Sequence, residues 1–199
     1  MLALLCAQYV LAAETGGSEN IEGCEVAQVL TIENFRLEKI GAGVRVKRAY
    51  LMNWPVYVAA LYCDNKKEFA RNSEDNKALE SMLKMPAFAI QLQLLRDVPA
   101  NDMVTSFEQA LKANNAQDSQ TLNNFKEMLR ARETLAYGES VTVMFINEPD
   151  NKRIICDQNG KDKVEIPGDD QAFKDILSIW LGIPVDDHMK TLRTKIIEG

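Results

Sequence analysis

The segment 55–63 constrains the fold most, because it is apolar on both of its faces. Successive side chains of a strand point to opposite faces of a sheet. One face of this segment would carry Val56, Val58 and Ala60, and the other Tyr57, Ala59 and Leu61. A strand with two apolar faces needs cover on both sides. We therefore expect 55–63 to be a central strand of a sheet that is covered on both faces.

Other stretches of the chain have the alternation and composition typical of strands. They are 25–32, 44–51, 87–96, 140–147, 153–157 and 163–166. The sequence Gly41-Ala42-Gly43 lacks the further residues of a dinucleotide or phosphate loop, so it predicts a tight turn before 44–51. Pro149-Asp150 and Asn159-Gly160 suit hairpin turns. The strands would therefore pair antiparallel, about seven in all.

Apolar residues recur at helical spacing in the middle of the chain and at its end. One helix is predicted to begin at Ser73, which would be its N-cap. Four more are predicted over 103–111, 122–129, 171–181 and 186–197. Asp170 and Asp186 are suitable N-caps for the last two helices. Strands in antiparallel pairs, with the helices grouped separately, favour an α+β fold over an alternating α/β fold.

The composition of the chain fits one soluble domain. Its 199 residues are enough for one sizeable core, and 46% hydrophobic with 26% charged residues is typical of globular proteins. The net charge is −6, and the densest basic pairs are only Lys47-Arg48 and Lys66-Lys67. Binding to nucleic acid needs a clustered basic face, and the sequence shows no such cluster. A nucleic-acid partner is therefore not expected.

Residues 1–13 form a short apolar run that ends in small residues and is followed by polar chain. The run is too short to cross a bilayer as a helix, and it fits a secretory signal peptide. We expect 1–13 to be a signal peptide, 14–24 a polar linker and 25–199 the folded domain. The mature protein would be periplasmic or secreted, without stable membrane insertion. The run lacks the usual basic start. Either the true start codon lies upstream, or the run is a buried strand or helix.

The remaining cysteines, Cys24, Cys63 and Cys156, match no metal-binding spacing. Their number allows one disulfide and one free thiol, whereas the apolar surroundings of Cys63 and Cys156 favour buried thiols. His188 is the sole histidine and stands at a helix start, where capping explains the acidic residues beside it. No metal, nucleotide or other cofactor is expected.

Four ordered segments carry a resemblance to a known family. They are Gly41-Ala42-Gly43-Val44-Arg45, the strand 57–62, the strand 87–96 with the helix that contains Phe107, and the end segment 179–184. Together they resemble the chalcone-isomerase-like family, and the Trp-Leu-Gly of 180–182 is similar to its exported bacterial branch. The resemblance implies an open-faced β-sandwich, in which helices cover a large antiparallel sheet and a ligand cleft lies between.

The same resemblance assigns five cleft positions. Arg45 matches the arginine that helps fix the substrate in the true isomerases, and Tyr57 takes the place of their catalytic threonine. Met103 takes the place of a tyrosine, Ser106 that of a lysine and Ala110 that of an asparagine. Ring closure needs donors aimed at the developing enolate, and methionine and alanine supply none. The resemblance therefore implies a protein without chalcone isomerase activity.

An arginine with a tyrosine is similar to the fatty-acid-binding branch of the family, where the pair holds a ligand carboxylate. A guanidinium fork and a phenol suit that head group, and an apolar cleft suits the chain. The expected partner is thus a fatty acid or similar amphipathic acid. Alternatively, Arg45 pairs with a core carbonyl or carboxylate and Tyr57 is a core aromatic. The competing functions are an isomerase or lyase of unknown substrate that uses both groups, and an interaction protein with a vestigial cleft.

Overall fold

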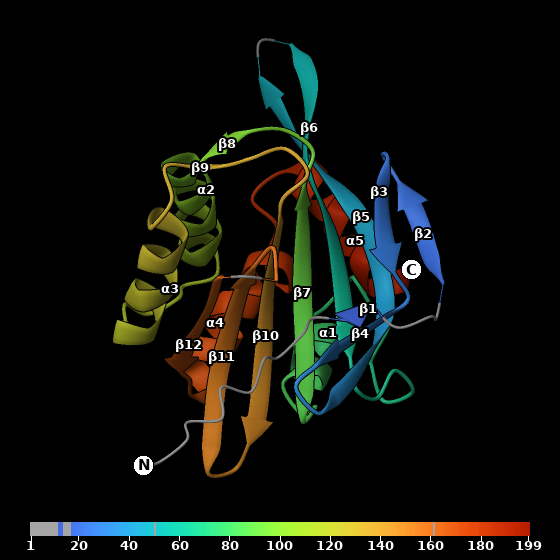
Figure 1. The fold of residues 1–199 in the computed structure, drawn as a ribbon, viewed down its shortest axis with the longest axis vertical. Coiled ribbons are helices and arrows are strands. Elements are labelled where there is room, and N and C mark those ends of the chain that lie inside the picture. The colour runs from blue at the N-terminus through green and yellow to red at the C-terminus, as the bar shows by residue number, and fades with distance from the viewer. Residues whose placement is uncertain (1–11, 14–16, 50, 161) are drawn as a thin grey trace, which may run out of the picture.

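The computed structural model describes residues 12–13, 17–49, 51–160 and 162–199. The predicted signal segment therefore lies outside the described residues, except for 12–13. The described chain forms an eight-stranded antiparallel sheet in the order β1-β4-β5-β6-β7-β10-β11-β12 (Figure 1). These strands are β1 (Ala12–Ala13), β4 (Val29–Ile32), β5 (Phe35–Ala49), β6 (Met52–Cys63), β7 (Ala87–Leu94), β10 (Ser140–Glu148), β11 (Asn151–Gln158) and β12 (Asp162–Pro167).

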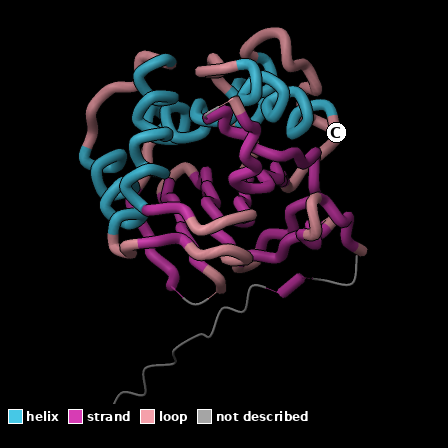
Figure 2. The backbone as a smooth tube through the Cα atoms, turned by 90° about the horizontal axis from the view of Figure 1, so that it is seen from above, coloured by secondary structure: helices cyan, strands magenta, loops and turns pink. Residues whose placement is uncertain are grey.

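The helices gather on one side of the strands, as Figure 2 shows. They are α1 (Lys77–Met82), α2 (Ala100–Ala113), α3 (Gln120–Arg130), α4 (Asp170–Leu181) and α5 (Asp187–Glu198). Two short antiparallel pairs complete the described fold, β2 (Ser18–Ile21) with β3 (Cys24–Ala27) and β8 (Val98–Pro99) with β9 (Thr134–Leu135). None of the described helices is long and apolar enough to cross a membrane. The predicted α+β class, with an antiparallel sheet covered by helices, is confirmed.

The sheet separates two hydrophobic cores, and β6 contributes to both of them. Tyr57, Ala59 and Leu61 pack in the large core beneath the helices. Val58 and Ala60 pack in a smaller core on the opposite face. Val56, predicted to share the face of Val58 and Ala60, packs instead against the large core, because the strand pairing is irregular next to Tyr57. Cover on both faces of this strand, predicted from its sequence, is therefore confirmed.

The β2–β3 hairpin supplies part of the smaller core, through Cys24 and Val26. Residues 18–24, predicted as part of a polar linker, thus belong to the folded body. The predicted strand 25–32 is divided between β3 and β4, which join different sheets. An exposed face on β2 explains why a polar stretch gave no strand signal.

The prediction of a glycine turn at 41–43 is wrong, because both glycines lie inside the continuous strand β5. Helix α5 crosses the strand so closely there that no side chain fits. A Cβ atom on Gly41 would lie 2.5 Å from the Lys195 carbonyl oxygen, and one on Gly43 would lie 2.7 Å from the Lys195 Cβ. Glycine marks a close approach here rather than a turn.

Two of the three predicted N-caps are also corrected. Helix α1 begins at Lys77, and the Ser73 hydroxyl binds the Glu198 carboxylate instead of capping it. The cap of α4 is Asp169, one residue before the predicted Asp170, because its carboxylate accepts from the Ala172 N–H. Asp186 caps α5 as predicted, accepting from the Met189 N–H at 2.7 Å.

The cysteines Cys24, Cys63 and Cys156 are buried free thiols. Burial raises the pKa of the Cys63 thiol to about 11 and that of the Cys156 thiol to about 12. They therefore pack as small hydrophobic residues, as predicted for Cys63 and Cys156. No disulfide joins the cysteines within the described chain.

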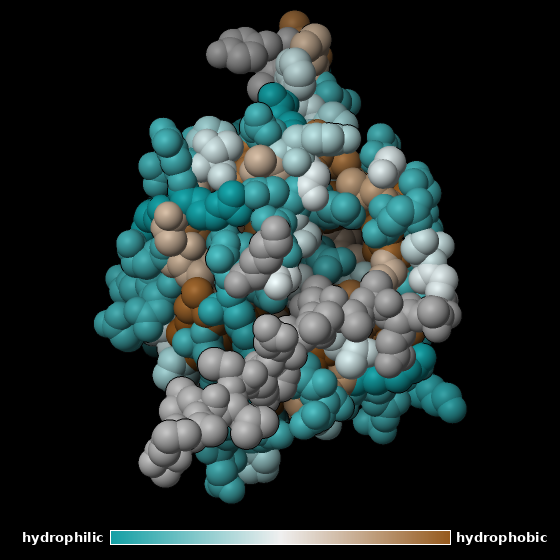
Figure 3. All heavy atoms as spheres, in the orientation of Figure 1, coloured by the Kyte–Doolittle hydropathy of each residue, from teal (hydrophilic) through white to brown (hydrophobic). Residues whose placement is uncertain are grey.

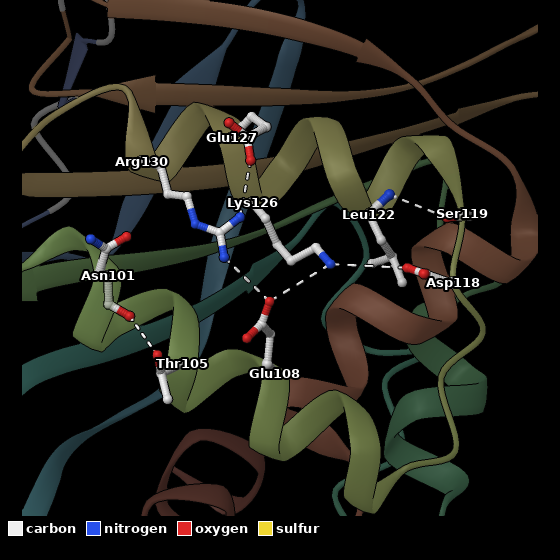
Figure 4. A network of polar contacts seen from close by, with 9 residues as sticks. All are labelled: Asn101, Thr105, Glu108, Asp118, Ser119, Leu122, Lys126, Glu127 and Arg130. Atoms are coloured by element: carbon white, nitrogen blue, oxygen red, sulfur yellow. Dashed lines mark hydrogen bonds and ion pairs between the residues drawn. The ribbon is translucent and has the colours of Figure 1, made fainter.

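The β5–β6 hairpin rises above the rest of the molecule, and hydrophobic side chains appear at its end (Figure 3). On the helical side, α2 is tied to α3 through Glu108, which lies 3.8 Å from the Lys126 amine and 3.3 Å from the Arg130 guanidinium (Figure 4). This contact turns the opposite face of α2 toward the sheet.

We expect Gly41→Ala to lower the melting temperature. Its methyl group would meet the Lys195 carbonyl, and such overpacking costs about 1–3 kcal/mol. For a chain of this size each kcal/mol corresponds to roughly 2–4 °C in a thermal melt. Ala42→Ser is the control, since Ala42 packs on the other face of β5. Equal melting of both variants would contradict the proposed close approach.

Candidate functional site

A cleft of about 380 Å³ lies between the β5–β6 region of the sheet and helices α2, α4 and α5. All five residues singled out from the sequence line it: Arg45, Tyr57, Met103, Ser106 and Ala110. Residues that sequence reasoning did not single out also line it, among them Lys47, Trp54, Arg96, Phe107, Ile179 and Met189. The five residues assigned from the resemblance thus line one cavity, and they make up part of its wall.

Strand pairing and helix periodicity place these side chains together. Arg45 pairs directly with Tyr57 across β5 and β6, and the register shifts immediately after Arg45. An irregularity of this kind re-aims the side chains beside it. On α2, Met103, Ser106, Phe107 and Ala110 have the i, i+3, i+4, i+7 spacing of a single helix face.

Arg45 is held by Asp186, the N-cap of α5. Its Nη1 donates to Asp186 Oδ1 at 2.8 Å and its Nη2 to Oδ2 at 2.6 Å, a bidentate pair. Nη1 also donates to the Val46 carbonyl oxygen at 2.7 Å. Although burial opposes ionisation of Asp186, hydrogen bonds from Arg45 and the Met189 N–H hold the pKa of that carboxyl below its usual value. Arg45 therefore pairs with a carboxylate, as the alternative expected, but this carboxylate belongs to a helix cap whose side chain is 42% exposed and not to the core.

Tyr57 is buried beside Arg45 and is only 4% exposed. Its hydroxyl donates no hydrogen bond to the described residues, so the O–H group is available to a ligand. The indole N–H of Trp180 is close enough to affect the hydroxyl, yet it is buried without a hydrogen-bond partner. Burial raises the pKa of Tyr57 to about 12, in spite of the nearby Arg45 charge. Tyr57 therefore presents a neutral phenol.

The rest of the inner wall offers few donors. Met103, Phe107 and Ala110 are buried and apolar. The Ser106 hydroxyl, the one polar side chain on this face of α2, donates to the Asp102 carbonyl oxygen of its own helix at 2.9 Å. The inner cleft can therefore hold an apolar group, with Tyr57 and Arg45 as its polar contacts.

The outer wall is charged and aromatic. The Arg96 guanidinium lies over the Trp54 ring, 4.8 Å from its centroid. The exposed Lys47 lies on the neighbouring strand, in register with Trp54. Asp97 and Asp102 also line the cleft. Sequence reasoning missed this wall because four separate parts of the chain supply it: β5, β6, the segment between β7 and β8, and α2.

We expect the protein to lose stability as the pH rises from about 10 to about 12. The pKa of Tyr57 is higher in the folded than in the unfolded chain, so over this window the folded state binds more protons. Tyr57→Phe removes the titrating hydroxyl. The unfolding free energy of this variant should therefore fall less steeply with pH over the same window than that of the original protein. Chemical unfolding at several pH values measures the slopes. Identical slopes for both proteins would contradict the assigned burial of the phenol.

Comparisons with known proteins agree with this architecture. The family model described as chalcone isomerase-like matches residues 18–192. A crystal structure of a fatty-acid-binding protein of Arabidopsis thaliana is similar, with a TM-score of 0.66 and 15% sequence identity, over 91% of this chain and 95% of that chain. At this identity the likeness concerns the fold. A comparison with curated proteins finds no match. The match over residues 18–192 shows that this chain belongs to the chalcone isomerase-like family.

Proposed function

We propose that this protein binds a fatty acid or similar amphipathic molecule in the cleft, without catalysing a reaction on it, and that it does so after export. The observation that carries the proposal is the wall of the cleft itself. An apolar inner surface ends at Tyr57, a neutral phenol whose hydroxyl donates no hydrogen bond within the described chain, and at the Arg45 guanidinium. Small-molecule sites in proteins combine a largely apolar lining with a few convergent polar groups.

The size of the cleft and its donors support this ligand class. A volume of about 380 Å³ is within the range of small-molecule sites, roughly 300–1,000 Å³. The Tyr57 hydroxyl can donate one hydrogen bond. Arg45 has five N–H donors, and three serve Val46 and Asp186. Five minus three leaves two N–H groups for a head group.

Asp186 sets a condition on that head group. Its carboxylate already neutralises Arg45 and would repel a ligand carboxylate bound to the same guanidinium. We therefore infer that the acid binds mainly through Tyr57 and the unused edge of Arg45, and less tightly than it would on an unpaired arginine. An uncharged amphipathic molecule avoids this repulsion.

Two further observations support the proposal. The similar plant structure, which has the same fold, is that of a fatty-acid-binding protein. The apolar residues 1–13, followed by polar chain, support export to the periplasm or beyond.

The enzymatic alternative fits the cleft less well. A phenol with a pKa of about 12 gives up its proton poorly at neutral pH. Met103 and Ala110 offer no donors for a developing oxyanion, and the Ser106 hydroxyl is engaged by its own helix.

We expect Asp186→Asn to tighten the binding of a long-chain carboxylate. Asparagine keeps the N-cap and removes a charge whose repulsion is worth at least about 1 kcal/mol, or about fivefold in affinity. Arg45→Ala should instead weaken the binding of the acid by about ten- to a hundred-fold, because a hydrogen bond to a charged group is lost. Calorimetric titration measures both changes.

The matched control is an uncharged alcohol of the same chain length. Burial alone supplies its affinity, so neither variant should change it appreciably. Equal losses of acid and alcohol in Arg45→Ala, or a collapsed thermal melt, would show that Arg45 only supports the structure. No effect of Asp186→Asn would contradict the competition between the two carboxylates.

We expect no acceleration of the cyclisation of naringenin chalcone. The inner wall lacks the donors that ring closure requires. The reaction is followed by absorbance at increasing protein concentration. Flavanone formation in proportion to the protein would refute the non-catalytic proposal while leaving ligand binding open to its own test.

A further inference from the structure

The end of the β5–β6 hairpin exposes large hydrophobic side chains. Leu51 is 89% exposed, Met52 52% and Trp54 36%, and we call these three residues the hairpin tip. The hairpin projects beyond the rest of the molecule, so nothing else in the described chain covers its end (Figures 1 and 3). Projecting apolar side chains of this size are uncommon on soluble proteins unless they meet a partner.

The backbone at Leu51 strengthens this interpretation. Its φ angle is +63°, in the left-handed region that asparagine and glycine favour. A leucine there is strained, and with 89% of its surface exposed it buries little of that surface within the described chain. A strained residue with no packing role indicates selection for something outside the chain.

The charge around the hairpin tip identifies the partner. Residues 39–63 contain no acidic residue, whereas the whole chain has a net charge of −6. Lys39 and Arg45 of this stretch are paired with Glu19 and Asp186, which leaves Lys47 and Arg48 as its unpaired charges in the described chain. Lys47 and Arg48 are exposed beside the tip. Arg96 is also exposed there and stacks on Trp54. Apolar residues ringed by basic residues match an anionic lipid surface, where tryptophan favours the interface.

The hairpin tip is also continuous with the cleft. Trp54 of the hairpin tip also lines the cleft, together with its cross-strand partner Lys47 and with Arg96, which stacks on it. Asp97 and Asp102 are the acidic residues of the same wall, and the Asp97 carboxylate is engaged by the Tyr137 N–H at 2.7 Å. A surface that took up the hairpin tip would therefore face the outer wall of the cleft.

We propose that the hairpin tip docks on the surface of an anionic lipid bilayer and brings the cleft to the membrane interface. Leu51 and Met52 enter the boundary of the acyl chains, while Lys47, Arg48 and Arg96 contact the lipid head groups. Docking is peripheral and reversible, and it goes beyond the proposed function because it does not depend on which molecule occupies the cleft.

The test is co-sedimentation of the full chain with phosphatidylcholine vesicles, with and without phosphatidylglycerol. We expect binding that requires the anionic lipid and weakens with salt. Leu51→Asn combined with Met52→Gln should lower the partition coefficient by about tenfold or more, since burial of both side chains is lost. Asparagine suits the positive φ at position 51, so the hairpin should keep its shape.

Charge is tested with matched pairs of lysine and arginine changes. Lys47→Gln with Arg48→Gln should weaken binding to anionic vesicles by about fivefold for each charge removed. Lys66→Gln with Lys67→Gln removes the same charge beyond the other end of β6 and should have little effect. If both double variants lost vesicle binding equally, the binding would reflect general electrostatic attraction and not docking through the hairpin tip. That result would overturn the proposal.

Trp54 gives a direct signal. The protein has two tryptophans, and Trp180 is only 1% exposed, so a blue shift of emission on adding vesicles reports Trp54. No vesicle binding, or equal binding by the Leu51→Asn, Met52→Gln variant, would overturn the proposal. A dimer in solution that this variant abolishes, without vesicle binding, would show that a second copy covers the tip instead.

Failure of this proposal is distinguishable from failure of the proposed function. Binding of a fluorescent fatty acid without vesicles tests the cleft alone, and the Leu51→Asn, Met52→Gln variant should bind it as the original protein does.

Discussion

The close contact between α5 and β5 determines the geometry on which the cleft depends. Gly41 and Gly43 leave room for the backbone of α5 at Lys195, and the helix can approach the strand there as a larger residue would not allow. The N-terminus of the same helix then lies beside Arg45, near the bulge in β5. A packing constraint at one end of α5 thus sets an electrostatic contact at the other.

Asp186 links the architecture of the site to its chemistry. As an N-cap, it satisfies the Met189 N–H and interacts favourably with the helix dipole. As the partner of Arg45, it holds the guanidinium in one orientation and reduces its positive field. Under the proposed function, selectivity among amphipathic ligands would depend on how a head group competes with an aspartate that also stabilises the helix.

The sequence predicted the central strand and the cleft residues well, because those signals are local or carried by ordered motifs. The apolar faces of β6 follow from alternation, and Arg45 and Tyr57 follow from a resemblance that spans most of the chain. The error at Gly41 has a physical cause: glycine permits both turns and close contacts, and only the position of α5 distinguishes them. Pairing between Arg45 and Asp186 joins residues 141 positions apart, which no local pattern reveals.

The balance of polar groups in the cleft favours binding over catalysis for a reason that goes beyond the loss of individual side chains. A catalytic site keeps donors oriented toward the charge that develops in the transition state. Here the strongest donor, Arg45, is directed at Asp186, and the Ser106 hydroxyl at its own helix. The phenol of Tyr57 remains, buried and neutral, within hydrophobic surroundings. This donor and the N–H groups that Arg45 leaves unused can orient a bound head group, but they do not form the set of preorganised donors that stabilises a charge developing in a transition state.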